Sequence, residues 1–241
     1  MIGLGTIINT AAIVVGGILG LFGGKLFKEE QQTSLNTVCG VSVLFIGIAG
    51  AMEGMLSLAD GAITSGNALL VVLCLAIGTI LGEIIGIENA FERFGEWLKR
   101  KTGNSRDAGF VNAFVNASLT VSIGAMAITG AIEDGIQGDW SILAVKAVLD
   151  FIIVAVMAST LGKGAIFSAI PVFVFEGVIT LLARVVAPLM TELALAYLSM
   201  IGSILIFCVG INLVWGSRVR VANMLPALVL AVVAAYLPFS L

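Results

Sequence analysis

The sequence predicts an all-α fold, a polytopic bundle of about eight transmembrane helices that forms one domain over residues 1–241. Two features of its composition support this. Hydrophobic residues make up 59% of the chain and charged residues 11%, whereas a soluble domain carries about 25% charge. The mean hydropathy is +1.14. A third feature is a series of apolar segments near the roughly 20 residues that a spanning helix needs.

These segments are residues 3–24, 36–56, 68–87, 109–131, 141–161, 165–187, 193–215 and 225–240. The last segment is the shortest. Pro226 would lie in its first turn and Pro238 would end it, and both positions suit proline at a helix boundary.

The loops predict the orientation of the chain. One set of alternate loops holds 10 of the 12 basic residues, and the exceptions, Lys146 and Arg184, lie inside apolar segments. The opposite loops contain acidic residues and no basic one. Because cytoplasmic loops are enriched in Lys and Arg, we expect the basic loops in the cytoplasm and both termini outside.

Residues 88–101 (ENAFERFGEWLKRK) predict a short amphipathic helix in the longest inner loop. Phe91, Phe94, Trp97 and Leu98 fall near one face at helical spacing, and charged residues lie mostly on the other. This pattern favours a helix that lies on the inner leaflet of the membrane. A site for a cytoplasmic partner is the alternative.

An internal repeat is visible in the first half of the chain. Residues 36–53 and 116–133 align without gaps, and seven of these 18 positions are identical, more than shared membrane composition predicts. We therefore expect two copies of one helix hairpin, about 3–56 and about 68–135, with helix 88–101 inserted in the second. The remaining helices cover about 141–240, and an inverted third copy within 165–215 is a further hypothesis.

Each hairpin begins with glycines at four-residue intervals, a spacing that lines one helix face and allows close helix packing in lipid. The glycines are Gly16, Gly20, Gly24, Gly78, Gly82 and Gly86. Packing within the chain is the simpler interpretation, and the seam of a homo-oligomer is the alternative.

Three glycine-rich stretches resemble a known family. They are MIGLGTIINTAAIVVGGILGLFGGKL at the start, GAMEG at 50–54 and SIGAMAITGAIEDG at 122–135. They are similar to the YqgA-type bacterial inner-membrane family, which carries a domain-of-unknown-function label, and the resemblance covers essentially the whole chain. It implies a multi-pass protein of the bacterial cytoplasmic membrane, of a kind often taken for a transporter. It implies no substrate and no functional residues.

Three carboxylates fall inside the apolar segments, where a charge costs about 2.5–3.5 kcal/mol on insertion scales. Glu83 lies near the inner end of its helix, where it can reach the membrane surface. Asp150 follows Lys146 by one helical turn, so the two can pair. That pair is either a structural neutralisation or part of a functional site.

Glu176 lies deep in its segment and has no opposite charge within one turn. Pro171 precedes it and should kink the helix, which would free a carbonyl oxygen beside the carboxylate. Arg184 is a distant candidate partner. We therefore expect Glu176 to be protonated or to hold a cation, as in a coupling site.

Neutral polar residues are also frequent in the segments, among them Asn9 in the first. Two pairs recur in the repeat and are the better candidates for cation ligands: Asn36 with Asn116 and Ser42 with Ser122. Taken singly, each is as well explained by a structural hydrogen bond between helices.

The absences exclude several classes of protein. There is no histidine, the three cysteines lie far apart, and no P-loop, GxSxG or HExxH motif is present. We therefore expect that the protein is not an enzyme and that it binds neither a cofactor nor a structural metal. The net charge of −3 predicts no nucleic-acid partner. The expected partners are the lipid bilayer and a small solute or cation.

The leading hypothesis is a secondary transporter or ion-conducting protein, coupled to protons or other cations. The alternative is a membrane protein that transports nothing and serves in assembly or regulation.

Overall fold

The computed structural model is an all-α polytopic bundle and describes residues 2–24, 28–59 and 62–237. In chain order its elements are α1 (Leu4–Gly24), α2 (Glu29–Met55), β1 (Leu56–Ala59), β2 (Ala62–Ser65), α3 (Ala68–Ile85), α4 (Ile87–Lys101), α5 (Phe110–Ser122), α6 (Ala125–Gln137), α7 (Ser141–Leu161), η1 (Lys163–Ser168), α8 (Ala169–Leu181), α9 (Ala183–Val186), η2 (Ala187–Leu189), α10 (Glu192–Trp215), η3 (Val221–Met224) and α11 (Pro226–Ala234).

Within the described residues, six helices are long and apolar enough to cross a membrane, or seven if α5 and α6 form one bent span. The predicted eighth span, 225–240, is the 9-residue α11, which is shorter than expected. Residues 238–241 lie outside the described part. The hydropathy of the sequence therefore predicts where the apolar segments lie, but the predicted last segment is too long.

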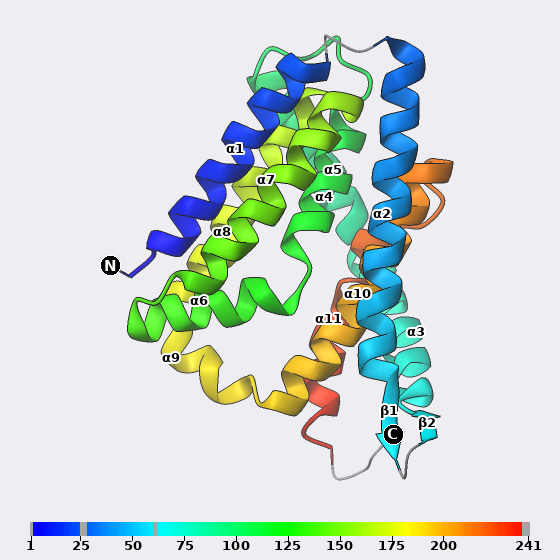
Figure 1. Ribbon diagram of the computed structural model, residues 1–241, viewed down its shortest axis with the longest axis vertical. Coiled ribbons are helices and arrows are strands. Elements are labelled where there is room, and N and C mark those ends of the chain that lie inside the picture. The colour runs from blue at the N-terminus through cyan, green and yellow to red at the C-terminus, as the bar shows by residue number, and fades with distance from the viewer. Residues whose placement is uncertain (1, 25–27, 60–61, 238–241) are drawn as a thin grey trace.

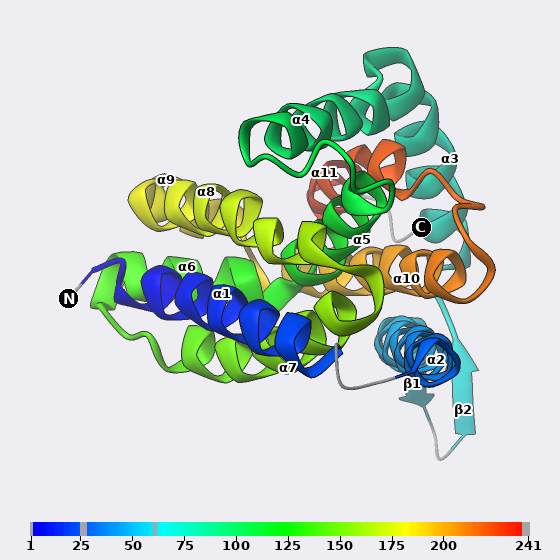
Figure 2. The same ribbon diagram turned by 90° about the horizontal axis from the view of Figure 1, so that it is seen from above.

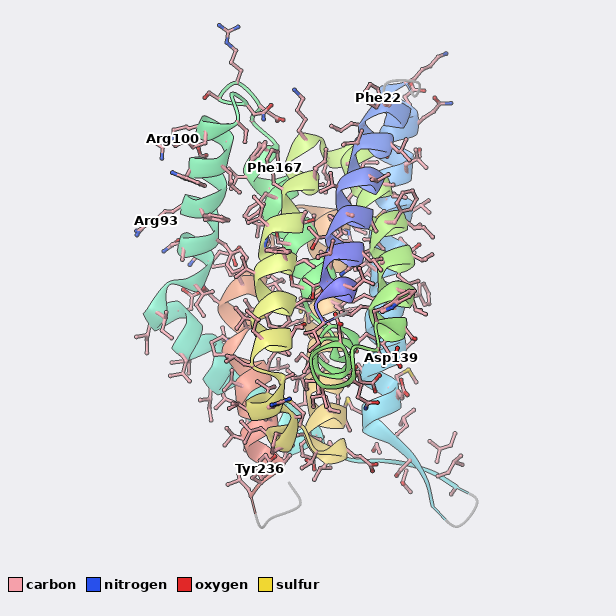
Figure 3. All side chains as sticks on the ribbon, turned by 90° about the vertical axis from the view of Figure 1, so that its left-hand side faces the viewer. Phe22, Arg93, Arg100, Asp139, Phe167 and Tyr236 are labelled. Atoms are coloured by element: carbon pink, nitrogen blue, oxygen red, sulfur yellow. The ribbon has the colours of Figure 1, made fainter. Side chains whose placement is uncertain are left out.

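Segment 109–131, which the sequence predicts as one spanning helix, is broken in the structure. Helix α5 stops at Ser122, α6 starts at Ala125, and the two axes meet at 62°. Between them Gly124 has φ +154°, a backbone conformation that favours glycine. Figure 1 shows α6 lying across the lower ends of α1, α7 and α8, and Figure 3 views it nearly end-on close to Asp139.

The longest helices pack in pairs that are far apart in the sequence. Helix α1 packs on α7 and α2 packs on α10 (Figures 1 and 2). The predicted glycine face of α1 forms the first contact. A Cβ atom on Gly16, Gly20 or Gly24 would come within 2.4, 2.0 or 2.6 Å of the carbonyl oxygens of Phe151, Ala155 and Ser159, respectively. The residue numbers of these partners increase in the same order along both helices, so α1 and α7 run parallel.

The glycines of α3 pack on the C-terminal segment. A Cβ atom on Gly78 would lie 2.5 Å from the Ala227 nitrogen, and one on Gly82 would lie 1.8 Å from the Asn223 carbonyl oxygen. Both glycine faces are thus used within the chain and are not left free as an oligomer seam.

Gly86 is not a packing residue, contrary to the sequence prediction. A Cβ atom there would meet only the Asn89 side chain, at 3.7 Å. Its φ of +74° ends α3, because the left-handed conformation terminates a helix and suits glycine. The chain then turns into α4.

Helix α4 confirms the expected amphipathic helix in residues 88–101 and lies at the edge of the bundle in Figure 2. Part of its apolar face packs on α5. The Phe94 ring stacks on Trp97 at 5.7 Å and meets Phe114 of α5 edge-on at 5.8 Å. Arg93 and Arg100 point away from the bundle in Figure 3.

An aspartate on α6 caps the start of α1. The two carboxylate oxygens of Asp134 accept hydrogen bonds from the backbone N–H groups of Gly3 and Gly5, at 3.0 and 2.9 Å. Asp134 follows the predicted span 109–131 and is fully buried. A carboxylate suits this position because the first N–H groups of a helix lack partners within the helix.

The predicted hairpin repeat is not reproduced in shape. Segment 36–53 lies inside the single helix α2, whereas segment 116–133 contains the break at Gly124. The β1–β2 hairpin between α2 and α3 is an addition that the sequence did not predict. A common ancestry of the two segments stays a prediction.

Candidate functional site

Four polar side chains from three helices meet inside the bundle. Asn9 comes from α1, Lys146 and Asp150 from successive turns of α7, and Glu176 from α8. Asn9 and Glu176 are 0% exposed, and Lys146 and Asp150 are 6% and 4% exposed. We call these four residues the charged cluster. Its depth matters because buried charges are unfavourable unless they are paired and hydrogen-bonded.

Two donors each bridge both carboxylates. The Asn9 Nδ2 group donates to Asp150 Oδ2 at 3.1 Å and to Glu176 Oε1 at 2.8 Å. The Lys146 ammonium forms an ion pair with Asp150 and lies 3.3 Å from Glu176 Oε1. The structure therefore contains the predicted Lys146–Asp150 contact and adds Glu176 to it.

The break between α5 and α6 supplies a third partner for the lysine. The ammonium of Lys146 donates to the Val121 carbonyl oxygen at 2.8 Å. Val121 is in the last turn of α5, where carbonyl groups lack helical partners and carry partial negative charge. Because the helix stops at Ser122, this carbonyl is available to the lysine.

The expected carbonyl at Pro171 is a wrong prediction. Pro171 lies in the first turn of α8, directly after η1, where no helical N–H is required. Residues Lys163–Leu181 form one candidate span, in which the 3₁₀ helix η1 is followed by α8 two residues before Pro171. The carbonyl that serves the cluster comes from Val121 instead. Arg184 is exposed on α9 and is replaced as partner of Glu176 by Lys146.

Two acceptors of the charged cluster have no partner within the described residues. They are Glu176 Oε2 and Asn9 Oδ1, both fully buried. With all groups ionised, the cluster has two negative charges and one positive charge. One further proton or monovalent cation would neutralise it and would satisfy an unpaired oxygen.

Helix α6 closes the outer side of the charged cluster, the side nearer the start of α1. Each helix that contributes to the cluster contacts α6 about one turn from its polar residue, on this outer side. Asp134 of α6 binds the Gly5 N–H, Gly130 packs on Leu143, and Gly135 packs on the Thr180 carbonyl.

The inner side of the cluster is closed by apolar residues. The residues one helical turn from the cluster on this side are Ile13 next to Asn9, Val154 next to Asp150, and Val172 next to Glu176. All three hydrophobic side chains are 0% exposed and belong to the same core. The charged cluster is thus enclosed between α6 on the outer side and an apolar layer on the inner side.

The other predicted residues lie elsewhere. Glu83 forms an exposed ion pair with Arg220, with 3.2 Å between Oε2 and Nη1. Ser42 is exposed and donates to the Val38 carbonyl oxygen at 2.9 Å. Ser122 is in the last turn of α5 and its hydroxyl has no partner within the described residues. The side chain of Asn36 lies outside the described part, so its pairing with Asn116 stays a prediction.

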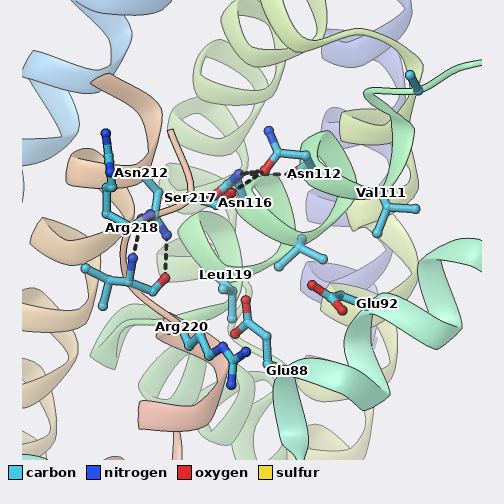
Figure 4. Close-up of a pocket in the computed structure, with 13 residues that line it drawn as sticks. Glu88, Glu92, Val111, Asn112, Asn116, Leu119, Asn212, Ser217, Arg218 and Arg220 are labelled. Carbon is cyan, nitrogen blue, oxygen red and sulfur yellow. Dashed lines mark hydrogen bonds between the residues drawn. The ribbon is translucent and has the colours of Figure 1, made fainter. Parts of the chain in front are cut away.

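Asn116 lines a polar cavity of about 450 Å³ between α5, the start of α4 and the loop that follows α10 (Figure 4). We call this cavity the vestibule. Asn116 Nδ2 donates to Asn112 Oδ1 at 2.8 Å, and Asn212 Oδ1 accepts from the N–H groups of Arg218 and Val219. The Asn212 amide therefore fixes the loop that forms part of the vestibule wall.

Glu88, at the start of α4, forms another part of the vestibule wall. Its carboxylate accepts from the Ala222 N–H at 2.9 Å, and its own N–H donates to Asn223 Oδ1 at 2.7 Å. Burial raises the pKa of the Glu88 carboxyl above its usual range, and the Ala222 hydrogen bond opposes the shift. These reciprocal bonds join α4 to η3.

Asn9 is one of several polar residues in the first predicted segment and was not predicted as a site residue, and neither was Val121. A signal for Asn9 was present, because Asn9 follows Gly5 by one turn and shares the face of α1 that continues through Gly16 and Gly20. No sequence signal marked Val121, since its role arises from a backbone carbonyl at a helix break.

Comparison with known proteins agrees with this architecture. The family described as "Protein of unknown function (DUF554)" matches residues 4–236. The chain is 31% identical over 232 residues to the Uncharacterized membrane protein YdfK of Bacillus subtilis (strain 168), covering 96% of this chain and 95% of that protein.

It is also 27% identical over 232 residues to the Uncharacterized protein YqgA of Escherichia coli (strain K12), covering 95% of this chain and 94% of that protein. No solved structure matches. The resemblance predicted from the glycine-rich stretches is thereby confirmed, and the chain belongs to the DUF554 family.

Proposed function

We propose that this protein is a secondary transporter in which the charged cluster takes up and releases one proton or one monovalent cation. A single observation carries the proposal. Two buried carboxylates face one ammonium, and Glu176 Oε2 has no partner within the described residues. An uncompensated charge at this depth costs several kcal/mol, so the cluster favours binding of one more positive charge.

The position of Lys146 favours a proton as the coupling ion. Its ammonium already contacts both carboxylates, in the place where a metal cation would have to lie. A proton on Glu176 Oε2 leaves all of these contacts in place. A sodium ion would need Lys146 to withdraw, for which the Val121 carbonyl offers a remaining partner at 2.8 Å.

Alternating access requires that the site be closed on at least one side at any time. In this structure α6 covers the outer side, and Ile13, Val154 and Val172 close the inner side. We assign outward opening to a movement of α6 about the bend at Gly124. Broken helices with a free terminus beside an ion site are typical of secondary transporters.

We further propose that the protein lies in the bacterial cytoplasmic membrane with both termini outside. The basic loops support this orientation, and two of them come together where Lys163 Nζ donates to Asn104 Oδ1 at 3.3 Å. A reporter fused after Leu241 that is active only in the cytoplasm would contradict this placement. The site binds and moves an ion, and we assign it no chemical conversion.

The test uses purified protein in proteoliposomes on a solid-supported membrane. Steps in pH, sodium and potassium are applied to the wild type, to Glu176→Gln and to Glu83→Gln. We expect a transient current in the wild type with at least one of these ions, its loss in Glu176→Gln, and its retention in Glu83→Gln. Glu83 is the matched control because its carboxylate lies in an exposed ion pair.

Two results would contradict the proposal. One is a wild type without current in response to any of the three ions, which favours a protein of assembly or regulation. The other is a Glu176→Gln variant whose currents keep the wild-type dependence on pH and cation. Asp150→Asn is then the next variant to measure, because Asp150 is the other buried carboxylate.

A further inference from the structure

A second cavity lies on the lipid-facing side of the bundle, between α8 and the group formed by α4, α5 and α11. Its volume is about 470 Å³, within the range of small-molecule sites. The described residues that line it are apolar, with Phe91, Phe175 and Leu228 among them, except for Ser118 and Ser122 of α5. We call it the serine cavity.

The two serines differ from three other hydroxyl residues within helices. Ser42, Thr120 and Ser203 each donate to the carbonyl oxygen four residues earlier, at 2.9, 2.7 and 2.8 Å. The hydroxyls of Ser118 and Ser122 are buried and have no partner within the described residues, although the same type of bond is open to them. Ser118 is 1% exposed.

Buried polar groups are normally hydrogen-bonded, so two unused hydroxyls in one cavity point to a ligand. They are four residues apart and therefore share one face of α5. Both serines line the cavity, and together they offer donors and acceptors to a single polar group placed between the helices.

The cavity is reached from the membrane. Val174 and Val178 of α8 line it and are 56% and 48% exposed on the outer surface of the bundle. In Figure 2, α4 and α8 border this side of the molecule, with α5 and α11 between them. A ligand dissolved in the bilayer can therefore enter without crossing the polar end of the protein.

We propose that the serine cavity binds a membrane-dissolved amphiphile with an apolar chain and one uncharged hydrogen-bonding group, of the class of long-chain alcohols. No charged side chain lines the cavity among the described residues, so a charged headgroup would lose its hydration without an opposite charge. An alkane would fill the apolar space and leave both hydroxyls unsatisfied. This site is separate from the charged cluster and does not depend on the transport proposal.

The test uses a long-chain alcohol that carries a photoreactive diazirine, with the full-length protein in proteoliposomes. After illumination, mass spectrometry locates the labelled peptides. We expect labelling in α5, α8 and α11 around the cavity, displaced by decanol much better than by decane. The double variant Ser118→Ala/Ser122→Ala should reduce displacement by decanol roughly tenfold, because two neutral hydrogen bonds are lost.

Two further variants keep the result interpretable. Ser203→Ala is the matched control, since its hydroxyl already bonds to Ser199 and the residue does not line the cavity. Leu228→Phe narrows the cavity without removing a serine, and it should weaken labelling even if the double alanine variant folds poorly.

Three results would overturn the proposal. The first is even labelling of lipid-exposed positions such as Val148 and Val229, which would show contact with bulk lipid only. The second is equal displacement by decane and decanol. The third is displacement by a phospholipid alone, which would assign the cavity to ordinary lipid.

Discussion

The Nζ atom of Lys146 lies 3.3 Å from Glu176 Oε1, although the two residues belong to different helices. Sequence spacing pairs Lys146 with Asp150 alone. In the folded chain the same ammonium contacts two carboxylates and a helix-terminal carbonyl. Removing the Lys146 side chain therefore leaves more than one group without this partner.

Replacing Lys146 tests this relationship. We expect Lys146→Ala to lower the free energy of unfolding by about 3–5 kcal/mol, because it leaves two carboxylates buried without an opposite charge. Lys146→Ala combined with Asp150→Asn should recover part of this loss. Thermal melting in detergent, followed for both variants and the wild type, measures the difference.

Lys163→Ala is the control for this pair, since Lys163 is exposed and bonds only at the surface with Asn104. It should melt like the wild type. Equal melting shifts for the single and double variants of the cluster would show that Lys146 and Asp150 do not interact.

The glycine contacts predict strong steric effects. Gly20→Leu and Gly82→Leu should each destabilise the fold by about 3 kcal/mol or more and reduce expression, because their Cβ atoms would overlap backbone atoms of Ala155 and Asn223. Gly23→Leu is a matched control on α1, where a Cβ atom meets nothing within 4 Å. Wild-type melting of both test variants would contradict the packing seen here.

The cap on α1 predicts a smaller effect. Asp134→Ala should cost about 1–2 kcal/mol, since the N–H groups of Gly3 and Gly5 lose their acceptor. The neighbouring Glu133→Ala serves for comparison and should have less effect. Hydrogen exchange of the first turn of α1 measures the change directly, and unchanged protection in Asp134→Ala would rule out a capping role.

The bend between α5 and α6 predicts a specific need for glycine. Gly124→Ala should destabilise the protein by about 1–3 kcal/mol, because φ +154° is unfavourable for a residue with a Cβ atom. Space is not the cause, since a Cβ atom there meets nothing within 4 Å. Gly66→Ala, also without close neighbours, should be tolerated, and equal melting of the two variants would argue against strain at the bend.

The helices were predictable where hydropathy alone determines them. Segment 141–161 coincides with α7, and 3–24 differs from α1 by one residue. The α5–α6 break was not predictable in this way, because Gly124 lies within an apolar run that reads as continuous. Only the fold shows that α6 is turned across the bundle by its contacts with Gly5, Leu143 and Thr180.

The candidate site was predictable in part for a similar reason. Glu176 and Asp150 stand out because a carboxylate in an apolar helix is unfavourable without a partner. Their partners depend on which helices pack together, and the spacing of residues within one helix does not predict that. Asn9 reaches Glu176 across 167 residues of sequence, and Lys146 reaches a carbonyl that exists as an acceptor only because α5 ends there.

The pairing of α1 with α7 has a consequence for biosynthesis. Asn9 enters the membrane with α1, yet its partner Asp150 follows 141 residues later. At roughly 5–20 residues per second, this delay is about 7–28 s. Throughout that interval the glycine face of α1 and the Asn9 amide have no native partner, so α1 must wait in the lipid or beside the insertion machinery. Assembly of the bundle is therefore late, and a nascent chain released before α7 emerges would keep the Asn9 amide without its partner Asp150.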